Sequence, residues 1–217
     1  MTEFKQVELS PSKVGPRPFY HFVKRGFDII GSGLGLIALS PVFAWVAYKV
    51  HHEDGGPVFY NQARVGKDGK LFKMYKFRSM IPNADKMVKQ LEDQNEVDGA
   101  MFKIKDDPRI TKIGKFIRKH SLDELPQLVN VFKGDMSLVG PRPPLPSEVE
   151  QYTDYDKQRL KVTPGCTGLW QVTKRNDANF DEMVELDLDY INNSGFFYDM
   201  GIIFKTVGVL FKPNSGY

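Results

Sequence analysis

Two adjacent carboxylates, Asp123 and Glu124, stand in the polar segment Ser121–Gln127 and have the residue types that nucleophilic or metal-assisted chemistry needs. Ser121 and Glu124 have the spacing of a capping box, and apolar residues follow at helical spacing until Gly134. We therefore expect Asp123 in or just before a first helical turn, where the positive end of the helix keeps a carboxylate ionised. The same pattern is also typical of residues that only cap a helix.

A basic segment precedes this pair and carries charge suited to phosphates. Residues 103–119 contain seven Lys or Arg against two Asp, while residues 176–200 contain seven acids and no Lys or Arg. Such a basic stretch binds phosphates, an anionic membrane surface or nucleic acid, or it forms the solvated face of a helix. It lacks the interleaved aromatic residues of a nucleic-acid platform, so we expect no nucleic-acid partner. Cys166 is the single cysteine, which excludes an intrachain disulfide and a cysteine-based zinc site and fits a reducing, cytosol-facing domain.

Two further polar side chains stand where a ligand could be held. Arg142 lies between Pro141 and Pro143, which restrict the backbone and suit the guanidinium to clamping a diphosphate. An ordinary polyproline turn has the same sequence signature. Asp187 falls on the apolar stripe of a predicted helix, seven residues after Phe180. A carboxylate in that place must be paired, hydrogen-bonded or bound to a ligand, and the pattern leaves a functional acid and a buried structural pair equally open.

A long apolar run, residues 26–50, follows Lys24 and Arg25 and predicts a membrane-inserted helix. As one straight helix it would be ~38 Å long, enough to cross a bilayer core of roughly 30 Å. Pro41 interrupts the run and removes one backbone hydrogen bond, for which the Ser40 hydroxyl is a local partner. Neither half can cross alone, so the run predicts either a kinked spanning helix or a re-entrant hairpin that bends at Ser40–Pro41.

The other patterns predict a mainly helical α+β chain of one domain with appendages. Residues 1–18 are polar and contain prolines, which predicts a flexible tail. Two β-like runs around the turn Gly66–Gly69 predict a small hairpin, whose basic residues Arg64, Lys76 and Arg78 either bind phosphate or form ordinary surface. The interrupted apolar segment Phe196–Phe211 is too short to span and predicts an amphipathic helix at the membrane interface.

Motifs spread over the chain closely resemble those of the bacterial sugar transferases, specifically the monotopic polyprenol-phosphate phosphoglycosyl transferases. The resemblance runs from about Tyr20 to Phe211. It rests on many motifs in the same order, namely Lys24–Asp28, Ser40–Pro41, Gly56–Phe59, Arg64–Gly66, Tyr75–Met80, Asp107–Thr111, Ser121–Gln127, Gly134–Pro143 and Pro164–Leu169. One departure is visible: Lys174 precedes Arg175 where relatives often carry Gly-Arg, so sugar specificity inferred from that loop stays open.

The resemblance implies an enzyme that moves a hexose 1-phosphate from a UDP-sugar to undecaprenyl phosphate, releases UMP and initiates the synthesis of an exopolysaccharide, a capsule or an O-antigen. It implies that Asp123 attacks the β-phosphorus and forms a covalent phosphosugar intermediate, with Glu124 as its partner in metal binding or proton handling. Mg²⁺, held by these two carboxylates, is the expected cofactor. The expected substrate-binding residues are Arg78, Arg118, Arg142, Arg175 and Asp187.

The resemblance also favours the re-entrant arrangement for residues 19–50 and a cytosol-facing catalytic domain over 51–217. The expected location is the cytoplasmic face of the bacterial inner membrane, with membrane lipids as partners and with a homodimer allowed. Two other functions fit part of the sequence. A membrane-anchored, Mg²⁺-dependent hydrolase of nucleotide diphosphosugars would consume the donor without a lipid acceptor, and a noncatalytic membrane-surface adaptor would need only the apolar run and the basic segment. The identity of the sugar and of the glycan pathway does not follow from the sequence.

Overall fold

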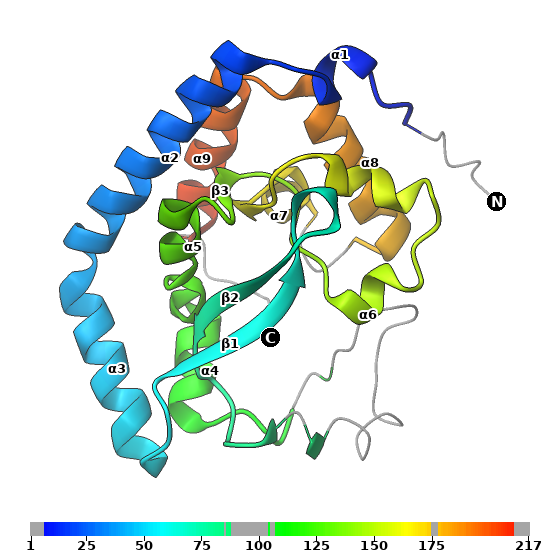
Figure 1. The fold of residues 1–217 in the computed structure, drawn as a ribbon. Coiled ribbons are helices and arrows are strands. Elements are labelled where there is room, and N and C mark those ends of the chain that lie inside the picture. The colour runs from blue at the N-terminus through cyan, green and yellow to red at the C-terminus, as the bar shows by residue number, and fades with distance from the viewer. Residues whose placement is uncertain (1–6, 85, 88–103, 105–106, 175–177, 211–217) are drawn as a thin grey trace.

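The computed structural model describes residues 7–84, 86–87, 104, 107–174 and 178–210, and it is mainly helical with a small β content, as the sequence predicts. Two long helices, α2 (Pro18–Ala38) and α3 (Ser40–Asp54), form a bent arm along one side of the molecule (Figure 1). The hairpin of β1 (Phe59–Val65) and β2 (Leu71–Phe77) crosses the middle of this view. A second sheet pairs β3 (Ser137–Val139) with β4 (Gly165–Thr167) in parallel. The other described α-helices are α1 (Pro11–Val14), α4 (Lys112–Lys119), α5 (Gln127–Lys133), α6 (Pro146–Val149), α7 (Leu169–Thr173), α8 (Phe180–Asn193) and α9 (Phe196–Leu210).

The arm bends by 60° where α2 meets α3, which confirms the predicted break at Ser40–Pro41. Pro41 has no N–H to donate to the carbonyl of Ile37, four residues before it. The Ser40 hydroxyl donates to that carbonyl instead, at 2.8 Å. Among the described residues no single helix is long and apolar enough to cross a membrane, and only this bent pair, taken together, meets the criteria of length and composition.

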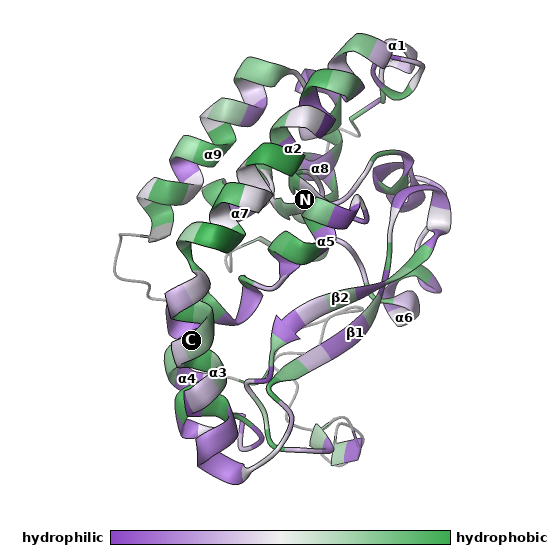
Figure 2. Ribbon diagram, turned by 60° about the vertical axis from the view of Figure 1, so that its left-hand side comes forward, coloured by the Kyte–Doolittle hydropathy of each residue, from purple (hydrophilic) through white to green (hydrophobic). Residues whose placement is uncertain are grey.

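Helix α2 turns polar residues toward the protein and many of its apolar residues outward. Asp28 and Ser32 are buried, and the Asp28 carboxylate accepts hydrogen bonds from the Ser137 hydroxyl at 3.0 Å and from the Leu138 N–H at 2.9 Å. Large apolar side chains of α2 are exposed instead, namely Phe19, Phe22, Ile29, Ile30, Leu34 and Ile37. Figure 2 shows the hydrophobic turns along α2. This polarity is the reverse of that of a surface helix in water and suits an apolar surrounding.

Helix α9 also exposes large apolar side chains, and buried polar contacts tie it to α2. Phe197, Phe204 and Val207 are exposed on α9. Asp199, near its start, forms an ion pair with Lys24 at 2.8 Å and accepts from the Tyr20 hydroxyl at 3.0 Å. The described part of the predicted interfacial segment 196–211 is therefore a helix with outward apolar residues, and position 211 lies outside the described residues.

The hairpin β1–β2 confirms the hairpin predicted around Gly66–Gly69. One of its faces carries residues of the candidate site. Asp68 (φ 55°) and Gly69 (φ 78°) reverse the chain, and the register pairs Tyr60 with Lys76 and Gln62 with Met74. Because side chains alternate along a strand, Gln62, Arg64, Met74 and Lys76 share one face. Helix α5 packs on this hairpin through the fully buried Asn130, whose side chain accepts from the Tyr75 N–H at 2.9 Å and donates to the Lys73 carbonyl at 2.7 Å.

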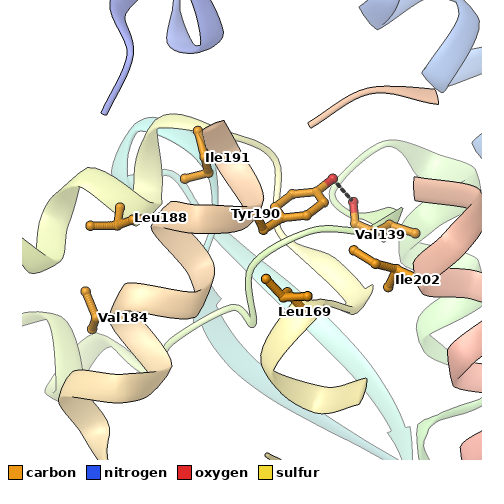
Figure 3. Close-up of a cluster of buried hydrophobic side chains, with 7 residues drawn as sticks. All are labelled: Val139, Leu169, Val184, Leu188, Tyr190, Ile191 and Ile202. Atoms are coloured by element: carbon orange, nitrogen blue, oxygen red, sulfur yellow. Dashed lines mark hydrogen bonds between the residues drawn. The ribbon is translucent and has the colours of Figure 1, made fainter. Parts of the chain in front are cut away.

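The parallel pair β3–β4 and the helices around it form a buried core. Figure 3 shows part of this core, where the Tyr190 hydroxyl donates to the Val139 carbonyl at 3.1 Å. Gly140, directly after β3, and Gly165, the first residue of β4, approach each other closely, because a Cβ on Gly165 would lie 2.0 Å from the backbone nitrogen of Gly140. Only glycine allows this approach, which places the loop that begins at Gly140 against β4.

Residues 7–18, for which the sequence predicts a flexible tail, contact α8 and its surroundings in the structure. The Val7 N–H donates to the Tyr155 hydroxyl at 2.8 Å, and the Ser10 N–H donates to the Asn192 side chain at 2.8 Å. Arg17 donates to the hydroxyl and the carbonyl of Ser194 at 2.7 and 2.9 Å. Acceptors supplied by Tyr155, by α8 and by the turn after α8 therefore satisfy backbone and side-chain donors of a segment whose own sequence has no periodic pattern. Residues 1–6 lie outside the described residues.

Candidate active site

The two carboxylates lie between α4 and α5, in a short 3₁₀ turn over Leu122–Glu124 that directly precedes α5. The expected position of Asp123 just before a helix is confirmed, but the capping box is wrong. Ser121 adopts a left-handed conformation (φ 54°) and its side chain makes no capping hydrogen bond. Ser121 reverses the chain directly after α4, so its side chain is not placed over the start of α5, where Pro126 is the cap.

Asp123 is a buried carboxylate with a raised pKa. Its exposed fraction is 7%, and this burial, reinforced by the neighbouring charge of Glu124, raises the pKa of Asp123 to about 6. Lys76 and Arg118 act in the opposite direction and limit the rise. The sequence predicts that the helix end keeps Asp123 ionised, but desolvation of this carboxylate has the larger effect on its pKa. At neutral pH the carboxylate is still mostly ionised, which is the form a nucleophile needs.

Glu124 differs from its neighbour in exposure and in charge environment. Its side chain is 47% exposed and forms an ion pair with Lys76 at 2.7 Å. Desolvation acts to raise the pKa of Glu124, but the charges of Lys76, Arg142 and Arg64 outweigh it and the pKa is lowered. Two adjacent carboxylates thus have pKa values that are pushed apart, an arrangement found where two acids take different roles.

Arg142 is held in a loop whose backbone is fixed from several sides. Its guanidinium is half-buried and lies 3.2 Å from the carboxylate of Glu148. Four successive carbonyl oxygens of the loop each accept a hydrogen bond from another part of the chain: Pro141 from Gly165 N–H (2.8 Å), Arg142 from Arg159 Nη2 (3.3 Å), Pro143 from Arg64 Nη1 (3.0 Å) and Pro144 from Val65 N–H (2.9 Å). Tertiary hydrogen bonds, in addition to the flanking prolines, therefore restrict where Arg142 can point.

Arg118 lies at the same site, whereas Arg78 is used structurally. Arg118, on α4, is one of the cations whose charge acts on Asp123, and its Nε donates to the Ser79 hydroxyl at 2.9 Å. Arg78 forms an ion pair with Asp54 and donates to the carbonyls of Pro57, Met80 and Val50. All five of its N–H groups have protein acceptors, so Arg78 ties the end of α3 to the hairpin and offers a substrate no free donor.

Asp187 is a buried acid that is linked to the loop of Arg142 through an arginine. It is fully buried on α8 and forms an ion pair with Arg159, which in turn donates to the carbonyl of Arg142. Of the two alternatives, the structure thus favours the buried pair, although the pair does help to hold the loop of Arg142.

Arg175 lies outside the described residues. Arg159 and Glu148 have no sequence signal that marks them, while the alternation of the hairpin could have placed Arg64 and Lys76 together.

Comparison with known proteins identifies the family. A model of the bacterial sugar transferases matches residues 19–213. The chain belongs to this family. The bacterial sugar transferase is 50% identical over 188 residues to the galactosyl transferase CpsE of Streptococcus agalactiae, and 49% identical over 200 residues to the undecaprenyl-phosphate galactose phosphotransferase of Salmonella typhimurium. These alignments cover 86% and 90% of this chain but only 42% of each relative, so the chain spans less than half of their length.

A third relative has nearly the same length as this sugar transferase. The exopolysaccharide production protein ExoY of Sinorhizobium fredii is 41% identical over 212 residues, which are 95% of this chain and 94% of the relative. A sequence of this size therefore occurs in the family alongside longer ones.

The donor set of the site fits Mg²⁺. This ion is usually held by one or two carboxylates, by water and by substrate phosphates. Asp123 and Glu124 supply two adjacent carboxylates, and the described residues contain no cluster of three His, Cys, Asp or Glu that could hold an ion on their own. The residues present thus suit an ion that arrives with a phosphate-bearing substrate.

The burial of Asp123 predicts a stability cost that depends on pH. The folded-state pKa of about 6 lies above the unfolded value of 3.8, so the stability of the wild type falls as pH rises through this interval. We expect Asp123→Asn to unfold at higher temperature than the wild type at pH 8 without metal, by about 1 to 3 kcal/mol in unfolding free energy. The difference should vanish near pH 4. Thermal melts in detergent with a chelator check this, and equal melting at pH 8 would contradict the raised pKa.

Proposed function

We propose that this chain is a phosphoglycosyl transferase that moves a hexose 1-phosphate from a UDP-sugar to undecaprenyl phosphate at the start of glycoconjugate synthesis. The observation that carries this proposal is the buried carboxylate of Asp123 beside Glu124, with the cations of Lys76 and Arg118 acting on Asp123 and those of Lys76 and Arg142 acting on Glu124. The names of the relatives, an undecaprenyl-phosphate galactose phosphotransferase and an exopolysaccharide production protein, support the same reaction class.

In the first step, a carboxylate oxygen of Asp123 attacks the β-phosphorus of the donor. The bond from this phosphorus to the oxygen that bridges to the α-phosphorus breaks, and UMP leaves with the electron pair of that bond. In the second step, a phosphate oxygen of undecaprenyl phosphate attacks the same phosphorus. The bond to Asp123 then breaks, so the lipid diphosphosugar is released and the carboxylate is regenerated.

The side chains of the site supply what these steps require. A desolvated carboxylate is a stronger nucleophile than one in water, and the pKa of about 6 leaves Asp123 ionised at neutral pH. Arg118, Lys76 and Arg142 stabilise the negative charge on the transferred phosphoryl group and on the leaving phosphate. Mg²⁺, held by Asp123 and Glu124, would offset the repulsion between the carboxylates and the diphosphate.

The dependence on acceptor tests this function. The purified chain with Mg²⁺ is incubated with a panel of UDP-sugars, with and without undecaprenyl phosphate, and released UMP is measured. We expect sustained turnover for at least one UDP-sugar and only when the acceptor is present. Sustained release without acceptor would favour a hydrolase. No release from any donor, with membrane binding intact, would favour a noncatalytic adaptor.

The bent arm, in this proposal, enters the cytoplasmic leaflet of the bacterial cell membrane and returns. Support comes from the 60° bend, from the outward apolar side chains of α2 and from the buried Asp28, which ties the middle of α2 to β3. Basic residues lie near both ends of the arm, Lys24 and Arg25 in the first half of α2 and Lys67 after α3. Because cytoplasmic flanks are enriched in Lys and Arg, both ends then face the cytosol.

This topology predicts equal protection of the two flanks. Single cysteines at the exposed positions Ser12 and Asp68, each in a Cys166→Ser background, should both be shielded from an impermeant thiol reagent added to intact cells. Both should react after the cells are opened, which serves as the control. Labelling of only one position in intact cells would mean that the arm spans the membrane.

A further inference from the structure

Arg64 differs from the other buried arginines because no carboxylate pairs with it. Four arginines are buried in the described part of the chain, with exposed fractions of 6% or less. Three of them form ion pairs with an aspartate: Arg78 with Asp54, Arg109 with Asp107 and Arg159 with Asp187. Arg64 instead donates to two neutral acceptors, the Pro143 carbonyl at 3.0 Å and the Gln62 side chain at 2.7 Å. Its Nε is buried and has no hydrogen-bond partner among the described residues.

A buried cation without a countercharge lowers the stability of the fold unless an anion enters its surroundings. Burial and the neighbouring charge of Arg142 lower the pKa of Arg64 to about 10, so the side chain still carries its charge at neutral pH. The charges of Glu148 and Glu124 act in the opposite direction, but within the described residues neither carboxylate forms an ion pair with Arg64, so its guanidinium lacks a direct countercharge. A ligand with negative charge is the partner that this arrangement suits.

The surroundings of Arg64 place that charge at the carboxylate site. Arg64 lies on the hairpin face that also carries Lys76, and its contact with Gln62 directs the guanidinium along the strand toward Lys76. Lys76 binds Glu124 at 2.7 Å. The other contact of Arg64 is the carbonyl of Pro143, the residue that follows Arg142. Arg64 thus contacts the loop of Arg142 directly. It also shares a hairpin face with Lys76, the ion-pair partner of Glu124.

We propose that Arg64 is a positioning residue for phosphate oxyanions: it fixes the loop so that Arg142 points at the phosphates, and its charge, which forms no ion pair within the described residues, raises the positive potential there. This inference rests on the proposed function. The donor diphosphate and the acceptor phosphate share the same oxyanion chemistry. We assign the donor, because its β-phosphorus must lie between Asp123 and the loop that Arg64 holds.

Nucleotide binding to the purified full chain in detergent with Mg²⁺ tests the assignment, with UDP as the probe. Arg64→Met should raise the Kd for UDP at least about tenfold, which corresponds to roughly 1.4 kcal/mol. Arg64→Lys, which keeps the charge but loses the planar fork, should recover most of this loss. The melting temperature of Arg64→Met should not fall, because the substitution removes a buried charge that has no countercharge.

Arg25→Met is the matched control. Arg25 also donates only to neutral acceptors, the carbonyls of Val131 and Phe132 at the end of α5, at 2.6 and 2.7 Å. It should lose stability without any change in the Kd for UDP. The opposite pattern for Arg64, with affinity lost and stability kept, separates positioning of the phosphates from a structural role.

Four outcomes would overturn the inference or its foundation. Unchanged UDP affinity together with an unchanged KM for undecaprenyl phosphate in Arg64→Met, or a variant that fails to fold, would make Arg64 merely structural. An unchanged Kd for UDP together with a raised KM for undecaprenyl phosphate would assign the charge to the acceptor and contradict the donor assignment. A wild type that neither binds UDP nor releases UMP would refute the proposed function, whatever the variants do.

Discussion

Asp123→Asn is expected to abolish both nucleotide release and the covalent intermediate. With donor and Mg²⁺ but no lipid, the wild type should release a burst of UMP of at most one per site and retain a phosphosugar on the protein. The amide of Asn has a similar shape but is a poor nucleophile, so this variant should show neither signal. In an enzyme that forms a covalent intermediate, removal of the nucleophile lowers kcat by several powers of ten, roughly 10⁴-fold or more. Intact-mass spectrometry after a mildly acidic quench, in which acyl phosphates survive best, detects the adduct.

Glu124→Gln is the matched control for this experiment. It alters the adjacent carboxylate, which is partly exposed and paired with Lys76, and should slow the burst without removing the adduct. Asp123→Asn should also retain UDP binding, which shows that the site is intact. Turnover that strictly needs donor and acceptor together, with no adduct at any quench time, would favour direct attack by the lipid phosphate and contradict the role of Asp123.

Asp187→Asn is expected to destabilise the fold strongly, because it leaves Arg159 buried without its countercharge. Although burial acts against the charged form, Asp187 holds the pKa of Arg159 above its ordinary value, so the cation persists. Breaking one side of such a pair costs about 3 to 5 kcal/mol. For a chain of this size the melting temperature should fall by roughly 6 to 20 °C, which thermal unfolding in detergent measures.

Two further variants separate the effect of an unpaired buried charge from the general effect of removing a carboxylate. Asp154→Asn removes the carboxylate of an exposed ion pair with Lys157 and should leave the melting temperature nearly unchanged. The double variant Asp187→Leu with Arg159→Met removes both buried charges and should recover stability. It should still show reduced turnover, because the Arg142 carbonyl loses the hydrogen bond from Arg159. Wild-type melting of Asp187→Asn would mean that the pair is not buried in solution.

The local features of this chain follow from the sequence because short-range sterics set them. The bend at Ser40–Pro41 follows from one missing N–H and one hydroxyl placed to replace it. The hairpin follows from two β-like runs around Gly66–Gly69, and the place of Asp123 before α5 follows from the apolar periodicity that begins after it. These signals involve residues only a few positions apart, so they can be recognised without knowledge of the fold.

Burial and long-range pairing are what only the tertiary structure decided. Sequence alone predicts an ionised Asp123 beside a helix end, whereas the packed fold desolvates this carboxylate and raises its pKa to about 6. Arg78 and Asp187 have site-like sequence settings, yet the fold pairs them with Asp54 and Arg159. Among the described residues, Arg64 is then the buried arginine without an aspartate partner. The sequence separations of 24 and 28 residues carry no periodic signal. The balance of desolvation against charge depends on which segments meet, and that is set by packing of the whole chain.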